Sequence, residues 1–252
     1  MYLFTIEGNI GSGKSTFIAS LKTKLFQIYG IPIIYIPEPV KQWEEIKSLE
    51  GQNMIELFYK DQPKYAFSFQ MMAYITRLHY LHTEIKKYPN CILISERSLL
   101  ADYHVFAKML FENGQISLEN YEIYKLWFWE FITDIKMSGI VYLKIDPQVC
   151  FERCTTRARK GENVISLEYL TNCSEMHDRW LKLEDTPVCE ILDNTDADIE
   201  KIELFIKCEI LEEDIEYYPP PSLVQLSCLG AMIVILLGYI FKIYVILDRI
   251  RC

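Results

Sequence analysis

The sequence lacks several patterns that define common classes of protein. None of its eight cysteines forms a C-x-x-C pair, and no group of cysteines and histidines has the spacing of a zinc site. No internal repeat is found, which excludes a repeat architecture. The N-terminus has no basic region followed by a cleavable hydrophobic run, so no signal peptide is expected. The scattered cysteines therefore favour reduced thiols in the cytosol.

Positive charge is also scarce, because 26 Lys and Arg residues face 35 Asp and Glu residues and the net charge is −9. A nucleic-acid-binding surface normally shows a basic stripe, so no nucleic acid is expected as a partner. This balance does not exclude a small basic pocket for phosphate groups. Half of the residues are hydrophobic and 24% are charged, which argues against long disordered regions.

Short apolar runs alternate with helical patterns along most of the chain. The runs are rich in β-branched and aromatic residues and mostly lack period-two alternation, which is typical of strands buried on both faces of a parallel sheet. We therefore expect an α/β fold with a five-stranded parallel sheet flanked by helices. The predicted strands are 2–7, 33–36, 91–95, 140–145 and 188–193, and the predicted helices are 14–29, 65–87, 99–111, 118–136, 147–159 and 167–183.

The strongest motif follows the first predicted strand, where residues 8–15 read GNIGSGKS and match the phosphate-binding pattern G-x-x-x-x-G-K-[ST]. Glycines let the loop turn its backbone N–H groups toward phosphate oxygens, and the next helix adds its dipole. Lys14 would reach the transferred phosphate, and the hydroxyl of Ser15 would hold Mg²⁺. The loop predicts a nucleoside triphosphate ligand without separating kinase, ATPase and GTPase. The predicted phosphate-binding residues are Gly8, Asn9, Gly11, Ser12, Gly13, Lys14, Ser15 and Thr16.

Four further stretches decide between these classes. Residues 38–43 (EPVKQW) and 96–98 (ERS) follow the second and third predicted strands, where a doubly wound sheet opens its crevice. Residues 69–77 (FQMMAYITR) lie in a predicted helix, and residues 153–159 (RCTTRAR) place three arginines on another. Each stretch alone has an ordinary structural explanation, such as a turn cap, a surface ion pair or a solvated helix face.

Together, in this order, the motifs resemble the deoxyribonucleoside kinase family, which includes deoxycytidine, deoxyguanosine and deoxyadenosine kinases, mitochondrial thymidine kinase and the insect multisubstrate enzyme. The resemblance covers roughly residues 2–195 and is carried by IEGNIGSGKST, EPVKQW, LFYKDQPKYAFSFQ, SERSLLADYHVFA and RCTTRARKGENVISLEYL. A thymidylate kinase would carry an Asp-Arg pair in place of Glu96-Arg97, and a GTPase would need NKxD, which the sequence lacks. The resemblance implies a P-loop kinase that phosphorylates the 5′-hydroxyl of a deoxyribonucleoside in nucleotide salvage, with ATP or another nucleoside triphosphate and Mg²⁺.

The resemblance also implies roles for individual residues. Glu38 would be the general base, with Arg97 and Lys14 as catalytic cations. Ser15 and Glu96 would attend Mg²⁺. Further phosphate-binding cations would be Arg153, Arg157 and Arg159. The implied nucleoside-binding residues are Trp43, Tyr59, Phe69, Gln70, Ala73, Arg77, Arg97, Asp102, Phe106 and Glu162, with Gln70 at the base edge, Trp43, Phe69 and Phe106 as apolar walls, and Tyr59 and Glu162 at the sugar 3′-hydroxyl.

An Arg and an Asp at the positions of Arg77 and Asp102 mark the branch of the family that uses deoxycytidine and purine deoxynucleosides. Physically, such a pair fills the space that a thymine methyl group would occupy and presents donors and acceptors to the base. Two alternatives stay open: a nucleoside monophosphate kinase on the same fold, and a catalytically inactive, membrane-tethered nucleotide-binding module.

A hydrophobic run near the end of the chain does not belong to the kinase motifs. Residues 223–247 (LVQLSCLGAMIVILLGYIFKIYVIL) contain one charge, Lys242, and are long enough to cross a hydrocarbon core of ~30 Å. We expect a kinase domain at 1–212, an acidic and proline-rich linker at 213–222 and a transmembrane helix at 223–247. An interfacial or buried helix and a non-native terminus are the alternatives.

These expectations together describe where the protein works. The kinase domain would be cytoplasmic and face the cytosol, with the chain associated with a membrane through its C-terminal anchor. The resemblance also implies that a homodimer is possible.

Overall fold

The computed structural model describes residues 1–132, 135–157, 164–192 and 195–217. The chain divides into two compact units, Met1–Glu203 and Leu204–Cys252, and α10 (Asp196–Tyr217) crosses this division. The predicted transmembrane segment at 223–247 lies outside the described residues. No helix in the described ranges is both long and apolar enough to cross a membrane.

The first unit is built on a six-stranded sheet with the order β2-β3-β4-β1-β5-β6. All neighbouring strands are parallel except β2 and β3, so the predicted parallel α/β sheet is confirmed. The predicted number of five strands is wrong, because a short antiparallel strand extends one edge. The strands are β1 (Tyr2–Gly8), β2 (Gln27–Ile28), β3 (Ile31–Ile36), β4 (Ile92–Glu96), β5 (Gly139–Leu143) and β6 (Val188–Ile191).

The extra strand follows a helix that is shorter than predicted. The helix expected at 14–29 is α1 (Lys14–Lys24), and Leu25 is already extended. Tyr29 and Gly30 then form a two-residue hairpin turn in which both have positive φ, 52° and 77°, as a type I′ turn requires. The tyrosine in this turn gave no turn signal in the sequence.

Three helices were not predicted from the sequence, α2 (Val40–Glu45), α3 (Met54–Lys60) and α10. A capping box starts α3, because Asn53 Oδ1 accepts from Glu56 N and Glu56 Oε2 accepts from Asn53 N, both at 2.9 Å. The remaining helices of the first unit are α4 (Gln62–Lys87), α5 (Leu99–Ala101), α6 (Lys108–Glu112), α7 (Leu118–Ile132), α8 (Pro147–Arg157) and α9 (Leu167–Leu181).

The helix expected at 99–111 is interrupted. Between α5 and α6, residues Asp102–Ala107 form a π-helical turn, labelled η1. Such turns insert extra residues into a helix and often occur at functional sites. Here Asp102 and Phe106 both line the same cleft, described below.

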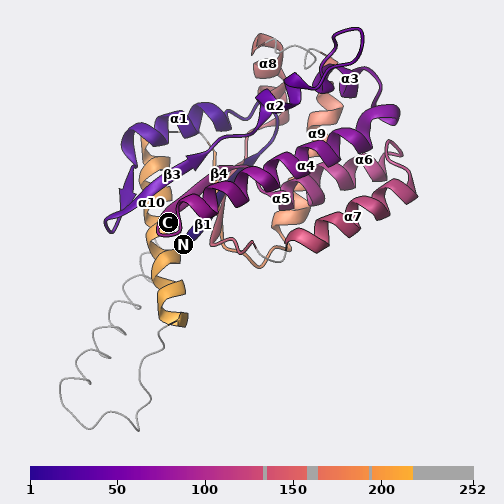
Figure 1. Cartoon of the computed structure of the whole chain (residues 1–252). Helices are drawn as coiled ribbons and strands as arrows, with labels where there is room; N and C mark the ends of the chain where they lie inside the picture. Colours follow the sequence, from indigo (N-terminus) through magenta and orange to yellow (C-terminus); the bar gives the residue numbers. More distant parts are fainter. Residues whose placement is uncertain (133–134, 158–163, 193–194, 218–252) are drawn as a thin grey trace, which may run out of the picture. The chain divides into compact units, whose positions relative to one another are not determined.

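The main core lies between the sheet and the helices on one of its sides. Figure 1 shows α4 and α7 side by side on this side of the strands, with α1 on the other side. Buried Leu3 and Leu93 of the strands meet Tyr74 of α4 and Tyr124 and Phe128 of α7. The strand order makes β1 and β4 the central pair of the sheet, and because they are parallel, the loops after them leave at the same edge.

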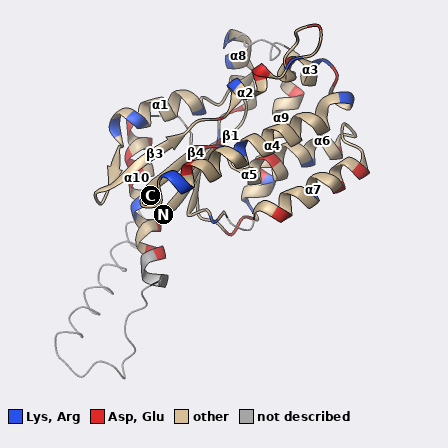
Figure 2. Cartoon of the chain, viewed as in Figure 1, with Lys and Arg blue, Asp and Glu red and all other residues tan. Residues whose placement is uncertain are grey.

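Charged residues of both signs are spread over the helices of the first unit (Figure 2). No helix in the described part of this unit carries a continuous basic face. Positive charges that could bind phosphate groups are therefore expected inside a pocket.

Candidate active site

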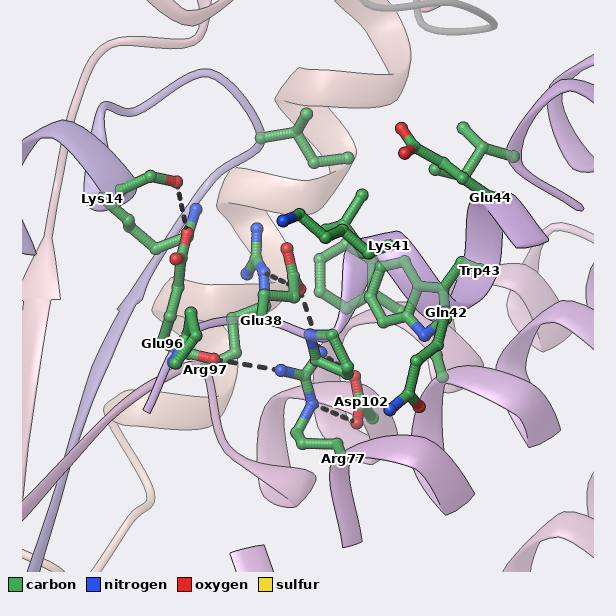
Figure 3. Close-up of a pocket in the computed structure, with 18 of the residues that line it drawn as sticks. Lys14, Glu38, Lys41, Gln42, Trp43, Glu44, Arg77, Glu96, Arg97 and Asp102 are labelled. Atoms are coloured by element: carbon green, nitrogen blue, oxygen red, sulfur yellow. Dashed lines mark hydrogen bonds and ion pairs between the residues drawn. The ribbon is translucent and has the colours of Figure 1, made fainter. Parts of the chain in front are cut away.

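A cleft of about 880 Å³ opens where β1, β3 and β4 end. The carboxyl ends of parallel strands meet at one edge of a sheet, which is where ligands bind in open α/β folds. Figure 3 shows charged side chains from the loops after these strands and from α4 converging on this space. The predicted site residues that line it are Gly11, Gly13, Lys14, Ser15, Thr16, Glu38, Trp43, Tyr59, Phe69, Gln70, Ala73, Arg77, Glu96, Arg97, Asp102, Phe106 and Arg157.

The loop between β1 and α1 has the backbone geometry of a phosphate cradle. Gly8 has a φ of 147°, and a Cβ there would lie 2.7 Å from the carbonyl oxygen of Leu143, so only glycine fits. Lys14 Nζ donates to the carbonyl oxygens of Gly8 at 3.1 Å and Asn9 at 2.6 Å. Burial, together with the positive charge of Arg97, lowers the pKa of Lys14 to about 7. The lysine is therefore poised to gain charge when an anion arrives.

Three of the predicted phosphate-binding residues take part in hydrogen bonds that connect this loop to α8 and α9. Asn9 Nδ2 donates to the carbonyl oxygen of Leu170 in α9 at 2.7 Å, and Arg153 Nη1 of α8 donates to that of Ser12 at 2.9 Å. Asn9, Ser12 and Arg153 are not among the cleft-lining residues, whereas Arg157 is. Two more predicted residues, Arg159 and Glu162, lie outside the described residues.

Two arginines surround the carboxylate of Glu38. Its Oε1 accepts from Arg77 Nη2 at 3.0 Å and lies 3.4 Å from Arg97 Nε. The same Arg77 guanidinium donates to Asp102 Oδ2 at 2.8 Å and Oδ1 at 3.3 Å, and to the carbonyl oxygen of Glu96 at 3.0 Å. Figure 3 shows this chain of contacts. Each of the three nitrogens of the Arg77 guanidinium thus has a partner, while Arg97 Nη1 is buried without a hydrogen-bond partner among the described residues.

The electrostatics keep Glu38 ionised. Burial alone would raise its pKa, but the positive charges of Arg77, Arg97 and Lys14 outweigh burial and lower it below its ordinary value of 4.5. Burial would likewise lower the pKa of Arg77, but Asp102 and Glu38 raise it, so the guanidinium stays charged. Near neutral pH the site therefore holds a carboxylate between two permanent cations.

A hydroxyl and a carboxylate lie together beside the phosphate loop. Ser15 Oγ donates to Glu96 Oε1 at 2.7 Å. Hard oxygen atoms of this kind are the ligands that Mg²⁺ prefers. No group of three or more acidic, histidine or cysteine side chains that could hold a metal occurs within the described residues. The oxygen atoms of Ser15 and Glu96 are the ones beside the phosphate loop that could hold a bound Mg²⁺.

Aromatic side chains form the other end of the cleft. Trp43 meets Phe69 edge to face at 5.8 Å between ring centroids, and Phe58 stacks on Phe69 at 4.6 Å. Trp43 Nε1 donates to Thr76 Oγ1 at 2.9 Å, which fixes the indole. Between these walls Gln70 is buried, and its Oε1 has no hydrogen-bond partner among the described residues. A flat apolar slot with one unsatisfied amide oxygen suits a heterocyclic base.

Some cleft residues were not found from the sequence. Tyr169, in the first turn of α9, lines the cleft and lies 6.1 Å from Tyr59 between ring centroids. Its only signal was its place three residues after Ser166, whose hydroxyl caps α9. Lys41, within the EPVKQW stretch, and Glu44, directly after it, also line the cleft (Figure 3), although only Glu38 and Trp43 of this region were predicted as site residues.

Comparison with known proteins agrees with this geometry. Residues 4–213 match the sequence model of the family described as deoxynucleoside kinase. A fowlpox virus protein named as a probable deoxycytidine kinase is 36% identical over 77% of this chain and 79% of its own length. Chicken deoxycytidine kinase 2 is 34% identical, over 70% and 72%. The mitochondrial deoxyguanosine kinase of Xenopus laevis is 32% identical, over 73% and 74%.

The family model covers the phosphate loop, the two motifs that follow β3 and β4, and the α8 arginine that reaches the cleft. The relatives cover more than two thirds of the chain at 30% identity or more. The chain therefore belongs to the deoxynucleoside kinase family.

Proposed function

We propose that this kinase transfers the terminal phosphoryl group of ATP, or of another nucleoside triphosphate, to the 5′-hydroxyl of deoxycytidine, of purine deoxynucleosides, or of both. The observation that carries the proposal is the contact of one guanidinium, Arg77, with both Glu38 and Asp102 beside the phosphate loop. This contact links Glu38, which we propose takes the proton of the hydroxyl, to Arg77 and Asp102, which we propose form the polar floor of the nucleobase site. The relatives are named as deoxycytidine and deoxyguanosine kinases, which supports the same substrates.

Glu38 is the general base in this proposal. A carboxylate of low pKa is a weak base for an alcohol, so it acts by position: it accepts the proton as the oxygen–phosphorus bond forms. The transition state spreads negative charge over the transferred oxygens. Lys14, Arg97 and Arg157 line the cleft as the cations that offset this charge. Arg153, which also donates to Ser12 of the loop, and Arg159 are proposed to join the phosphate-binding set.

Ser15 and Glu96 would hold Mg²⁺, Ser15 directly and Glu96 directly or through water. When bound, Mg²⁺ neutralises phosphate charge and orients the leaving group. The short contact between these two side chains supports the assignment.

The nucleoside lies between the aromatic walls. The unsatisfied Oε1 of Gln70 is suited to accept from an exocyclic amino group, which cytosine and adenine carry on the base edge. Ala73 leaves room beside it, and Arg77 with Asp102 form the floor. Tyr59 is proposed to bind the sugar 3′-hydroxyl together with Glu162.

The test is turnover of the full-length protein with ATP and each of the four deoxynucleosides. Deoxycytidine or a purine deoxynucleoside is expected to have the highest kcat/KM, and thymidine as the fastest substrate would contradict the proposal. Nucleoside monophosphates are assayed in parallel, because faster turnover of a monophosphate would favour the monophosphate kinase. A protein that binds ATP but turns over none of these substrates would favour the inactive binding module.

We also propose that the kinase domain faces the cytosol and that residues 223–247 anchor the chain in a membrane. The hydropathy of this segment is the support. Fractionation of the full-length protein against a chain ending at Tyr218 tests it. Equal solubility of the two proteins without detergent would contradict the anchor.

A homodimer is proposed as well, formed through α7. One face of this helix exposes Ile123, Leu126 and Trp127, at i, i+3 and i+4, and Trp127 stacks on Phe131 at 5.5 Å between ring centroids. An exposed apolar helix face that includes an aromatic residue is characteristic of interfaces. Sedimentation of Trp127→Glu should show monomers where the unsubstituted chain dimerises, with Leu49→Glu, at an exposed position outside α7, as the control.

A further inference from the structure

We propose that Glu7 is a positioning residue that holds the Glu96–Ser98 turn, so that Arg97 points into the cleft. The proposal rests on the kinase reaction proposed above. Glu7 belongs to β1, is fully buried, and is not among the residues that line the cleft. It acts on the reaction through Arg97 alone.

The turn that carries Arg97 is strained. Arg97 directly follows β4 and has a φ of 65°, in the left-handed region. This conformation is unfavourable for an L-residue, because its Cβ approaches the following carbonyl oxygen. Among the described residues, the other non-glycine residue with positive φ is Tyr29, in the exposed hairpin turn. A buried residue held in this way needs surrounding contacts that impose the conformation.

Three hydrogen bonds impose it. Arg97 N donates to the carbonyl oxygen of Ile6 at 3.1 Å, and Ser95 Oγ donates to the carbonyl oxygen of Arg97 at 2.8 Å. The third and shortest runs from Ser98 N to Glu7 Oε1, at 2.7 Å. It ties the residue after Arg97 to the central strand. Without the carboxylate of Glu7, the N–H group of Ser98 would have no side-chain acceptor from β1.

Glu7 has a further property that packing alone does not explain. Its second oxygen, Oε2, has no hydrogen-bond partner among the described residues. Burial raises the pKa of this carboxyl group, and Arg97 is the largest influence that opposes the rise. An apolar side chain of similar volume would avoid the unfavourable burial of a polar group in a central strand. The presence of a glutamate at position 7 is therefore best explained by the hydrogen bond that its carboxylate accepts from Ser98 N.

The conformation of the Glu96–Ser98 turn determines where the Arg97 guanidinium lies. Arg97 Nε lies 3.4 Å from Glu38 Oε1, and its Cζ lies 4.8 Å from the ring centroid of Phe106. If the turn relaxes to an ordinary φ, this guanidinium moves away from the proposed base. Small displacements of a catalytic cation are enough to lower kcat strongly.

The experiment compares two replacements of Glu7 in the full-length protein. Glu7→Gln keeps an oxygen acceptor for Ser98 N, so kcat should stay within about threefold of the unsubstituted chain. Glu7→Ala removes the acceptor, and kcat should fall by roughly 10- to 100-fold. Thr5→Val is the matched control, because Thr5 is buried two residues earlier in β1 and its hydroxyl also has no partner among the described residues. Its kcat should be unchanged.

A double-mutant cycle separates positioning from a general structural role. If Glu7 acts through Arg97, Glu7→Ala should lower kcat no further in an Arg97→Ala background. An equal loss in both backgrounds, or the same loss for Glu7→Gln as for Glu7→Ala, would overturn the proposal. Crystal structures of the unsubstituted chain and Glu7→Ala give a readout independent of turnover. The proposal would also be overturned if Arg97 kept its left-handed φ and its position beside Glu38 in the structure of Glu7→Ala. This outcome does not depend on whether the proposed reaction is correct.

Discussion

Arg77 and Asp102 form a two-bond ion pair, Nε to Oδ2 at 2.8 Å and Nη2 to Oδ1 at 3.3 Å, with 4% and 3% of their side chains exposed. The same Nη2 donates to Glu38. The group proposed to select the base is therefore bonded directly to the group proposed to take the proton. Changes in substrate selectivity and in catalytic rate should be coupled in this enzyme.

The first prediction follows from this link. Replacing the pair together, as Arg77→Met with Asp102→Ala, removes both buried charges and opens space at the floor of the cleft. The ratio of kcat/KM for thymidine to that for deoxycytidine should rise by about tenfold or more, because a thymine methyl group no longer meets a polar pair. Steady-state kinetics with both nucleosides measure it.

The same double variant should lose kcat with every nucleoside, since Glu38 also loses the Arg77 hydrogen bond that holds its carboxylate in position. The exposed pair Arg179 and Glu112 provides the matched control, as Arg179→Met with Glu112→Ala. An unchanged nucleoside preference in the Arg77/Asp102 variant would contradict the selectivity role. Arg77→Met alone is a poor test, because breaking one side of a buried pair costs about 3–5 kcal/mol.

The second prediction concerns Glu38. Glu38→Gln keeps the shape and the contacts but cannot accept a proton, so kcat should fall by about 10²- to 10⁴-fold with little change in KM. Glu44→Gln, an exposed carboxylate lining the same cleft, is the control and should leave kcat unchanged. Turnover that persists in Glu38→Gln would mean that another group, or no group, acts as the base.

The pH dependence of the same reaction has a defined sign. The pKa of Glu38 is lowered, so its carboxylate is already formed at pH 4.5 and its protonation should lower kcat only below that pH. The ion pairs of Glu38 likewise contribute stability at higher pH that is lost as the pH falls through this lowered pKa. Chemical denaturation between pH 3 and 6 would show this loss.

The positions of the motifs were predictable because parallel strands bring distant segments together by rule. Glu38 follows β3 and Arg97 follows β4, and the carboxyl ends of these two strands are neighbours. A motif that directly follows a buried strand of a parallel sheet therefore has a defined location, at the edge where ligands bind.

Other features depend on tertiary packing that one sequence does not display. The π-helical turn that begins at Asp102 changes which side chains of its helix face the cleft. No residue pattern in residues 101–107 (ADYHVFA) predicts the inserted residue. The hydrogen bond from Arg153 to the carbonyl oxygen of Ser12 was not indicated by the sequence, since it depends on how α8 packs; phosphate binding by Arg153 stays a prediction. Glu7 read as an ordinary strand residue because its partner, Ser98 N, lies 91 residues away.

The third prediction concerns Mg²⁺. Ser15→Ala removes an oxygen that we propose holds the metal, and Glu96→Gln removes the negative charge of the second proposed ligand, so the Mg²⁺ concentration for half-maximal activity should rise by roughly 10- to 100-fold in each, as for other losses around metal ligands. Chelation of Mg²⁺ should abolish turnover of the unsubstituted chain. Ser20→Ala, in the same helix but outside the cleft, is the control. An unchanged Mg²⁺ requirement in both variants would place the metal elsewhere.

The fourth prediction concerns the protonation of Lys14. Burial lowers its pKa to about 7, so at pH 8 most of the free enzyme carries a neutral lysine. The phosphates of a bound nucleotide favour the charged form, so binding at pH 8 should take up a proton that binding at pH 6 does not. Calorimetry of ADP binding in buffers of different ionisation enthalpy measures this uptake.

Lys14→Arg tests the assignment, because arginine stays charged throughout this range and should remove the proton uptake specific to pH 8. Lys22→Arg, in the last turn of α1, should leave it intact. The stability of the ligand-free protein has a matching sign. Between about pH 7 and the ordinary value of 10.5, the unfolded chain binds a proton at Lys14 that the folded chain does not, so stability should rise with pH. A slope that persists in Lys14→Arg would assign the effect to another group.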